Sequence, residues 1–129
     1  MTSAMRYLPV LGRVLMCVIF VLGGFGKLTH PSGTIGYIAK GGLPLPMVAY
    51  VISVIIELGG GLALLVGFKT RWVAAVLAVF CVVTALAFHN NFADQGQMVN
   101  FLKNLTMAGG FLFVVAHGAG PLSLDNRRG

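Results

Sequence analysis

Charged side chains, and acidic ones above all, are scarce in this chain of 129 residues. Asp, Glu, Lys and Arg together make up 9% of it, whereas a typical soluble domain carries about 25%. Three residues are acidic and nine are Lys or Arg. Hydrophobic residues account for 57% of the sequence. This composition excludes an ordinary soluble protein and predicts one membrane domain over residues 1–129.

Cysteine and histidine are also few, and their spacing matches no metal or redox motif. Cys17 and Cys81 both lie inside apolar runs, without a Cys-x-x-Cys pair. A disulfide scaffold or a thiol-exchange enzyme is therefore not expected, and the three scattered histidines complete no zinc signature. No haem ligand pair, flavin motif or iron–sulfur cysteine set is evident. The basic residues form no continuous stripe, so nucleic acid is not an expected partner.

Four apolar runs dominate the sequence, and each approaches the ~20 residues that cross a bilayer. They predict an all-α integral-membrane bundle of four transmembrane helices over residues 8–26, 45–66, 72–88 and 98–116. The first run ends without a small-x-small cleavage site, which favours a retained span over a signal peptide. Basic residues near both termini and in the turn at 67–71 predict that this side faces the cytoplasm in a multi-pass bacterial inner-membrane protein. These residues are Arg6, Lys69, Arg71, Arg127 and Arg128.

One carboxylate, Glu57, interrupts the apolar run from 51 to 67. A charge at that depth is costly unless a partner holds it. At 1.5 Å per residue, Glu57 lies about 14 Å and Arg13 about 8 Å from the inner ends of their predicted helices. We therefore predict an Arg13–Glu57 ion pair between the first two helices. Two alternatives stay open: the pair only fixes helix packing, or Arg13 snorkels to the cytoplasmic surface.

Small and polar residues recur at helical spacing on one face of each run, as at helix contacts in lipid. In the first helix this stripe is Arg13, Cys17, Phe20, Gly24 and Lys27, and in the last it is Lys103, Thr106, Gly110, Phe113 and His117. If the stripes converge, polar side chains ring a cavity at the outer end. Lysine, asparagine and histidine there can hold a carbonyl, a quinone oxygen or an anion, or transfer protons. The candidates are Lys27, His89, Lys103 and Asn104, the alternative being a wetted helix end.

Several segments together resemble the DoxX family of small bacterial four-helix membrane proteins. They are "GRVLMCVIFVLGGFGKL", "IELGGGLALLVGFKTRWVA", "FHNNF" and "FLKNLTMAGGFL", in this order between about residues 8 and 120. The resemblance implies quinone-linked redox chemistry on sulfur, thiol or oxidative-stress substrates, with electrons supplied through a partner subunit. The family's recurring polar positions match Arg13, Lys27, Glu57, His89, Lys103 and Asn104.

Three functions are compatible with these residues. In the first, the chain is a membrane subunit of a quinone-linked oxidoreductase. Proton transfer and the ion pair would involve Glu57, Arg13 and His89, and the quinone or anion head group would be bound by Lys103, Asn104, His89 and Lys27. Glu57 suits proton transfer because burial favours its neutral form while a nearby cation favours its charge. The second is a small proton-coupled transporter, and the third a non-catalytic scaffold. Whether the chain is itself an enzyme, its substrate and its oligomeric state, including a homo-oligomer, stay open.

Overall fold

Helices make up almost all of the computed structural model, which describes residues 3–126. Four helical stretches are long and apolar enough to span a membrane: Ser3–Thr29, Pro46–Val66, Thr70–Phe88 and Gln95–His117. The predicted all-α, four-span membrane architecture is therefore confirmed, although the first helix begins five residues earlier than expected. The elements are α1 Ser3–Thr29, α2 Pro31–Lys40, α3 Pro46–Val54, the π-helical turn η1 Ile55–Gly59, α4 Gly60–Val66, α5 Thr70–Phe88 and α6 Gln95–His117.

The helix boundaries follow from local sequence chemistry. Pro31 and Pro46 begin α2 and α3, because proline is compatible with the first helical turn, where its missing N–H has no partner to lose. Gly67 ends α4 with a φ of 73°, a left-handed conformation that glycine adopts without strain. Asp94 caps α6 by accepting a hydrogen bond from the Gln97 amide. The short helix α2 was not predicted, since its glycines and its length of ten residues make a weak signal.

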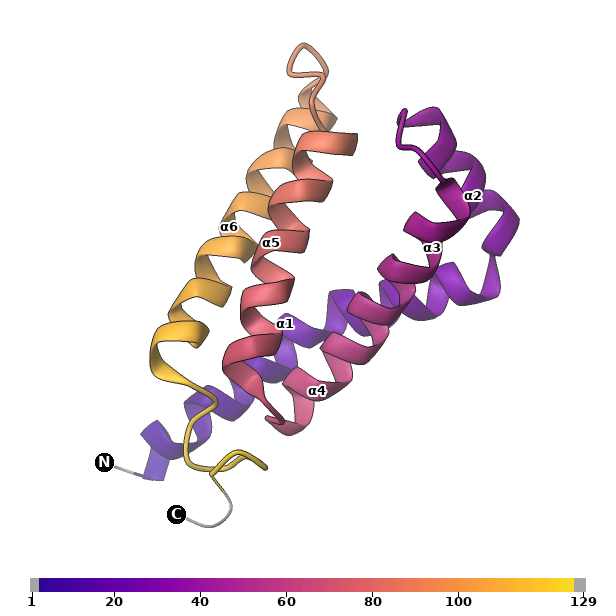
Figure 1. Cartoon of the computed structure of the whole chain (residues 1–129). Coiled ribbons are helices and arrows are strands. Elements are labelled where there is room, and N and C mark those ends of the chain that lie inside the picture. Colours follow the sequence, from indigo (N-terminus) through magenta and orange to yellow (C-terminus); the bar gives the residue numbers. More distant parts are fainter. Residues whose placement is uncertain (1–2, 127–129) are drawn as a thin grey trace.

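Two helical hairpins build the molecule. Antiparallel α5 and α6 pack along their length, while α1 packs against η1 and α4. Both termini lie at one end, with the turn from α4 to α5, and we call this the terminal end (Figure 1). At the opposite, open end, α2 and α3 diverge from α5 (Figure 1). That the terminal end faces the cytoplasm stays a prediction, and two of the arginines on which it depends, Arg127 and Arg128, lie outside the described residues.

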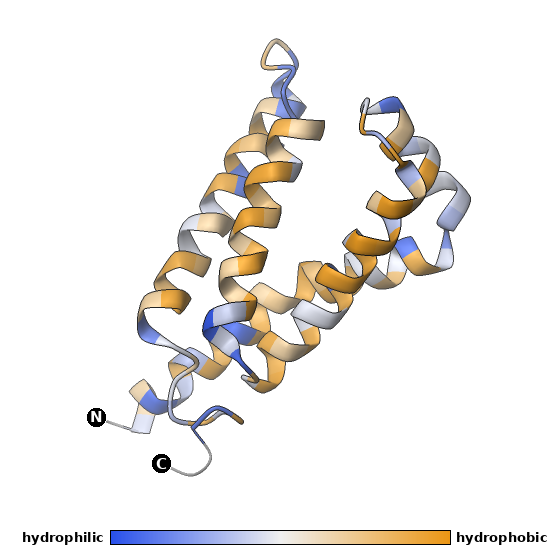
Figure 2. Ribbon diagram, in the orientation of Figure 1, coloured by the Kyte–Doolittle hydropathy of each residue, from blue (hydrophilic) through white to orange (hydrophobic). Residues whose placement is uncertain are grey.

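Hydrophobic packing is concentrated in the half near the terminal end. Phe20 of α1 meets Phe111 of α6 with ring centroids 5.5 Å apart, and Leu64 of α4 packs into the same cluster. Cys17 and Cys81 are free thiols in this core, as expected of small buried hydrophobes. The outward faces are apolar along most of each span, with polar residues mainly near the ends (Figure 2). This surface is what a lipid bilayer contacts.

Close contact between α1 and the second span depends on glycine. A Cβ on Gly24 would lie 2.9 Å from the Leu58 amide nitrogen, and one on Gly61 would lie 2.9 Å from a Val21 methyl. Small residues allow such approach in lipid, where packing replaces the hydrophobic effect between helices. These two contacts fix the register of α1 against η1 and α4.

Replacing Gly24 should therefore separate these helices. We expect Gly24→Ala to destabilise the protein by about 1–3 kcal/mol, because backbone atoms of η1 must move to admit the methyl group. Thermal unfolding in detergent measures this loss. Gly26→Ala is the matched control, since a Cβ there meets nothing within 4 Å. Equal melting temperatures for the two variants would contradict the close contact.

Candidate functional site

A cavity of about 210 Å³ with several polar side chains in its wall lies at the open end, lined by residues of α1, α2, α3, η1, α5 and α6. Lys27, Glu57, His89 and Asn104 all line it. The structure thus brings together four of the six residues singled out from the sequence. Arg13 and Lys103 do not line this cavity. We call it the polar cavity; its remaining polar lining comes from Thr34, Tyr37, Ser53 and Thr84.

Glu57 forms its ion pair with Lys27, not with Arg13. Lys27 Nζ lies 2.7 Å from Glu57 Oε2, and the glutamate is 8% exposed. Gly23 of α1 faces the carboxylate, since a Cβ there would lie at van der Waals distance, 3.5 Å, from Glu57 Oε1. Tyr50 donates a hydrogen bond of 2.9 Å to the Lys27 carbonyl and ties this part of α1 to α3. The predicted Arg13–Glu57 pair is wrong because α1 meets the second span in a different register.

Arg13 instead holds the terminal end together. It is 4% exposed, and its guanidinium donates to four backbone carbonyls. Nη1 reaches Leu64 and Leu65 at the end of α4, at 3.1 and 2.8 Å. Nε reaches Ala119 at 3.1 Å and Nη2 reaches Leu122 at 2.6 Å, both after α6. A cation at a helix C-terminus also opposes the negative end of the helix dipole. These contacts give Arg13 a structural position far from the polar cavity.

The buried face of α6 differs from the predicted one. Ala108 and Phe111 are buried, while Lys103, Thr106, Phe113 and His117 of the predicted stripe are exposed. Asn104, one residue further on, lines the polar cavity and donates a hydrogen bond of 3.3 Å to the Thr84 hydroxyl. The expectation that Lys103 faces this cavity is therefore wrong.

His89 lies where α5 ends, on the wall of the polar cavity. Its backbone amide donates to the Ala85 carbonyl at 3.0 Å. Within the described part of the chain, its imidazole makes no hydrogen bond, ion pair or ring contact. The ring is thus available to donate to, or accept from, a molecule that enters the cavity.

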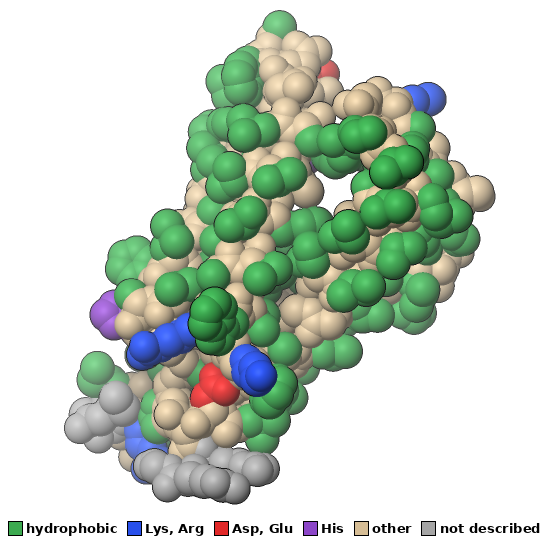
Figure 3. All heavy atoms as spheres, viewed as in Figure 1, with side chains coloured by type: hydrophobic (Ala, Val, Ile, Leu, Met, Phe, Trp, Pro, Cys, Tyr) green, Lys and Arg blue, Asp and Glu red, His purple; other side chains and the backbone are tan. Residues whose placement is uncertain are grey.

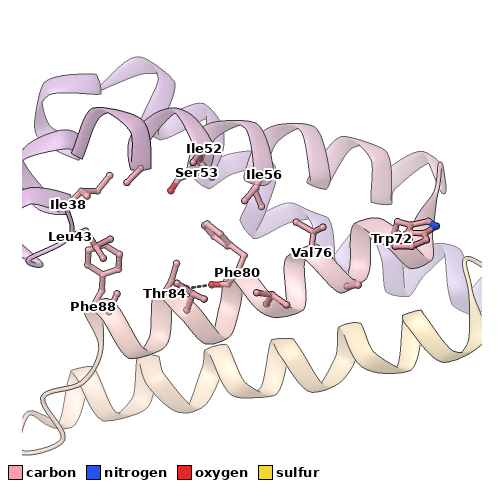
Figure 4. Close-up of a pocket in the computed structure, with 15 residues that line it drawn as sticks. Ile38, Leu43, Ile52, Ser53, Ile56, Trp72, Val76, Phe80, Thr84 and Phe88 are labelled. Atoms are coloured by element: carbon pink, nitrogen blue, oxygen red, sulfur yellow. Dashed lines mark hydrogen bonds between the residues drawn. The ribbon is translucent and has the colours of Figure 1, made fainter. Parts of the chain in front are cut away.

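An apolar groove of about 580 Å³ opens between α3 and α5 and adjoins the polar cavity. The side chains of Phe80, Thr84 and Phe88 extend from α5 toward α3 (Figure 4). The Ser53 hydroxyl points into the groove from the other side (Figure 4). Both spaces are lined by Ile38, Ser53, Phe80, Thr84 and Phe88. The polar cavity and the apolar groove are therefore neighbours that share these residues in their walls.

Two features of the site were not predicted from the sequence. Glu57 lies in the π-helical turn η1, which interrupts the α-helical hydrogen bonding of the second span. Such turns are frequent at functional sites, but no local sequence pattern marked this one. The helix α2 supplies Tyr37, whose ring stacks on Phe88 at 5.3 Å and covers the cavity from the open end. The aromatic residue within 31–40 was the one signal that this segment packs on something.

Comparison with known proteins places these features in a family. The DoxX family model matches residues 8–90, which include most of α1 and all of α2 to α5. The cavity residues Lys27, Glu57 and His89 lie within this match, and Asn104 of α6 lies outside it. The chain is 43% identical over 116 residues to inner membrane protein YqjF of Escherichia coli, covering 90% of this chain and 88% of that one. It is 34% identical over 130 residues to inner membrane protein YphA of the same organism, covering 97% and 93%.

A more distant similarity, 24% identity over 131 residues, is found with the yeast ER-derived vesicles protein ERV29. That match covers 98% of this chain and 35% of ERV29. No solved structure matches the chain significantly. With four membrane-spanning helices and two closely similar inner-membrane proteins, the chain is a multi-pass protein of the bacterial inner membrane. Its match to the family model over most of its length shows that it belongs to the DoxX family.

Proposed function

We propose that this chain is the membrane subunit of a quinone-linked oxidoreductase that acts on sulfur, thiol or oxidative-stress substrates. The observation that carries the proposal is that the polar cavity adjoins the apolar groove and shares five lining residues with it. A quinone has a polar head and a long apolar tail, and the two adjoining spaces match these two parts. The groove lies between α3 and α5, and its lining is almost entirely apolar (Figure 4).

The polar lining suits a quinone head chemically. Asn104 and His89 offer N–H donors to carbonyl oxygens. Lys27 is 30% exposed in its side chain, so that a ligand can approach its ammonium group. Bound there, a quinone supplies the acceptor for two electrons and two protons. The electrons come from the sulfur or thiol substrate through a partner subunit.

Glu57 is the proposed proton carrier. Its carboxylate is held by Lys27 at 2.7 Å inside the same cavity that would hold the head group. Protonation of Glu57 would break this ion pair, and delivery of the proton to the quinone would restore it. Lys27 therefore has the role that was predicted for Arg13. His89, at the mouth of the cavity beside the turn from α5 to α6, connects the site to the aqueous side.

Neighbouring residues of α6 provide a test of head-group binding. In nanodiscs, we expect Asn104→Leu to weaken the binding of a short-chain ubiquinone or menaquinone analogue about tenfold, through loss of a polar contact in a buried site. Lys103→Gln is the matched control and should bind like the parent, since Lys103 is exposed outside the cavity. Fluorescence quenching of the protein by the quinone measures the affinity. Absent binding, or equal losses in both variants, would contradict the proposal.

The proton role needs a separate measurement. In membranes that contain the partner, Glu57→Gln should slow thiol- or sulfur-dependent quinone reduction while quinone affinity changes little. Unchanged turnover in this variant would remove Glu57 from the mechanism. The transporter alternative has less support, because Glu57 is held by Lys27 within the same chain and is less free to exchange a proton for a cation. Proton-coupled uptake in vesicles would favour that alternative.

A further inference from the structure

A second hollow, of about 320 Å³, lies at the terminal end, remote from the polar cavity. Lys69 and Arg71 contribute its cationic side chains, and Trp72 and His117 form part of its wall. We call it the basic hollow. The antiparallel packing of α5 and α6 produces it, because the first turn of α5 comes to lie beside the last turn of α6. Basic side chains on either side of an acidic one are visible there, next to the apolar surface (Figure 3).

Within the part of the chain that the structure describes, the charges of the Lys69 and Arg71 side chains are not paired with a carboxylate. Between residues 3 and 126, neither the Lys69 nor the Arg71 side chain forms a salt bridge; Lys69 lies over the Phe68 ring at 5.7 Å. The single carboxylate of the hollow, Asp125, accepts the amides of Lys69 and Thr70 at 2.7 and 2.8 Å. Its charge is thus directed at the start of α5.

Asp125 stays ionised in this position. Burial would raise the pKa of its carboxyl, but hydrogen bonds with Thr70 and Lys69 and the charge of Arg13 outweigh burial, and the pKa is lowered. Two permanent cations therefore face one fixed anion in the basic hollow. The hollow keeps a positive charge at neutral pH.

Trp72 places this charge at the level of lipid headgroups. Its side chain is 78% exposed, and tryptophan is enriched where hydrocarbon meets water. The residue also begins the apolar groove that runs along α5 toward Phe88. A molecule with an anionic head in the basic hollow would have its apolar part beside Trp72 and the outward face of α5. Basic pockets between membrane helices bind anionic headgroups in this way.

We propose that the basic hollow is a binding site for an anionic phospholipid, whose phosphate is held by Lys69 and Arg71. The proposal is independent of quinone binding, because its charged residues lie at the other end of the spans. Free phosphate shares the headgroup chemistry but lacks the apolar part that Trp72 would contact. The lipid source is therefore favoured, and the experiment separates the two.

Native mass spectrometry of the full chain, delipidated in detergent, measures lipid binding. We expect phosphatidylglycerol to bind more tightly than phosphatidylcholine of the same chain length. Lys69→Gln and Arg71→Gln should each weaken phosphatidylglycerol binding about fivefold, as expected for one cation near a lipid surface, and phosphatidylcholine binding should not change. Lys40→Gln is the control, since Lys40 is an exposed lysine at the open end.

Two results would overturn the proposal. One is a lack of selectivity. It would appear as equal affinity for the two lipids, or as unchanged phosphatidylglycerol affinity in the Lys69→Gln/Arg71→Gln double variant when its melting temperature is also unchanged. The other is displacement of phosphatidylglycerol by inorganic phosphate beyond the effect of sodium chloride at the same ionic strength, which would assign the hollow to a free anion. Quinone affinity in the double variant should equal that of the parent, so failure here would leave the proposed function untouched.

Discussion

Arg13→Met should lower the melting temperature in detergent by roughly 10 °C or more, the largest loss we expect from a single substitution. The methionine retains the apolar stem but removes the guanidinium donor from the carbonyl oxygens of Leu65, Ala119 and Leu122, while the Leu64 carbonyl keeps a second donor, the Gly67 amide. An unsatisfied buried polar group costs about 1–3 kcal/mol, and water can reach some of these, so the loss of stability should be at least about 3 kcal/mol.

The segment after α6 should show the effect locally. Hydrogen exchange at residues 118–126 should accelerate in Arg13→Met, because the guanidinium links this segment to α1 and α4. Arg6→Met is the control, since Arg6 is exposed on the same helix and should be neutral. If the two variants melted alike, the carbonyl contacts would have no energetic importance. A loss confined to activity, with stability intact, would return Arg13 to the functional role first predicted for it.

Lys27→Met should cost about 3 kcal/mol, because it leaves the Glu57 carboxylate buried without its partner. Glu57→Gln should cost less, since the Lys27 side chain is 30% exposed and can turn toward water. The Lys27→Met/Glu57→Gln double variant should recover much of the loss. Equilibrium unfolding of the four proteins gives the coupling energy directly.

A second cycle serves as the control. Arg13→Met and Glu57→Gln should be additive to within about 0.5 kcal/mol, because the two residues share no partner. Coupling in that cycle, and none between Lys27 and Glu57, would contradict the pairing described here. If the Lys27→Met/Glu57→Gln variant recovered quinone-linked activity together with stability, the ion pair would be structural and the scaffold alternative would be favoured.

The membrane fold could be predicted well from the sequence because it depends on the length and apolarity of the spans. The inward face of the first helix could also be recognised. Arg13, Cys17, Phe20 and Gly24 are the buried residues of α1, and all four belong to the predicted stripe. Small and polar residues stand out clearly on this helix, because the alternatives on its other faces are large and apolar.

The partner of Glu57 could not be predicted because pairing depends on the register of two helices. The prediction aligned the inner ends of the first two spans, which brought Arg13 toward Glu57. The contacts of Gly24 with Leu58 and of Gly61 with Val21 set a register displaced by about two helical turns. Glu57 therefore meets Gly23 and Lys27, and Arg13 reaches the end of α4. The amino-acid composition does not show at which glycine two helix backbones come close together.

The inward face of α6 was misassigned for another reason. Lys103 and Asn104 are adjacent, and small residues follow at helical spacing from both, so two neighbouring faces have similar patterns. The prediction chose the face with the stronger charge. A lysine side chain can instead extend along an apolar surface to water, whereas the Asn104 amide finds a buried hydroxyl on Thr84. Polarity alone does not decide which of two such faces points inward.

The π-helical turn at Ile55–Gly59 divides the second span into two α-helical parts whose residue patterns are offset from each other. An α-helix advances about 100° per residue, so a turn that accommodates one extra residue shifts the helical phase of the sequence after it relative to the sequence before it. Ser53, before the turn, lines the apolar groove, and Gly61 and Leu64, after it, are buried in the core. Insertions and deletions in this span are thus not equivalent to those in a regular helix. Loss of one residue within the turn would close it into a regular α-helix and leave the α3 half of the site facing α5, whereas loss of one residue from α3 itself would rotate the residues before it by about 100°.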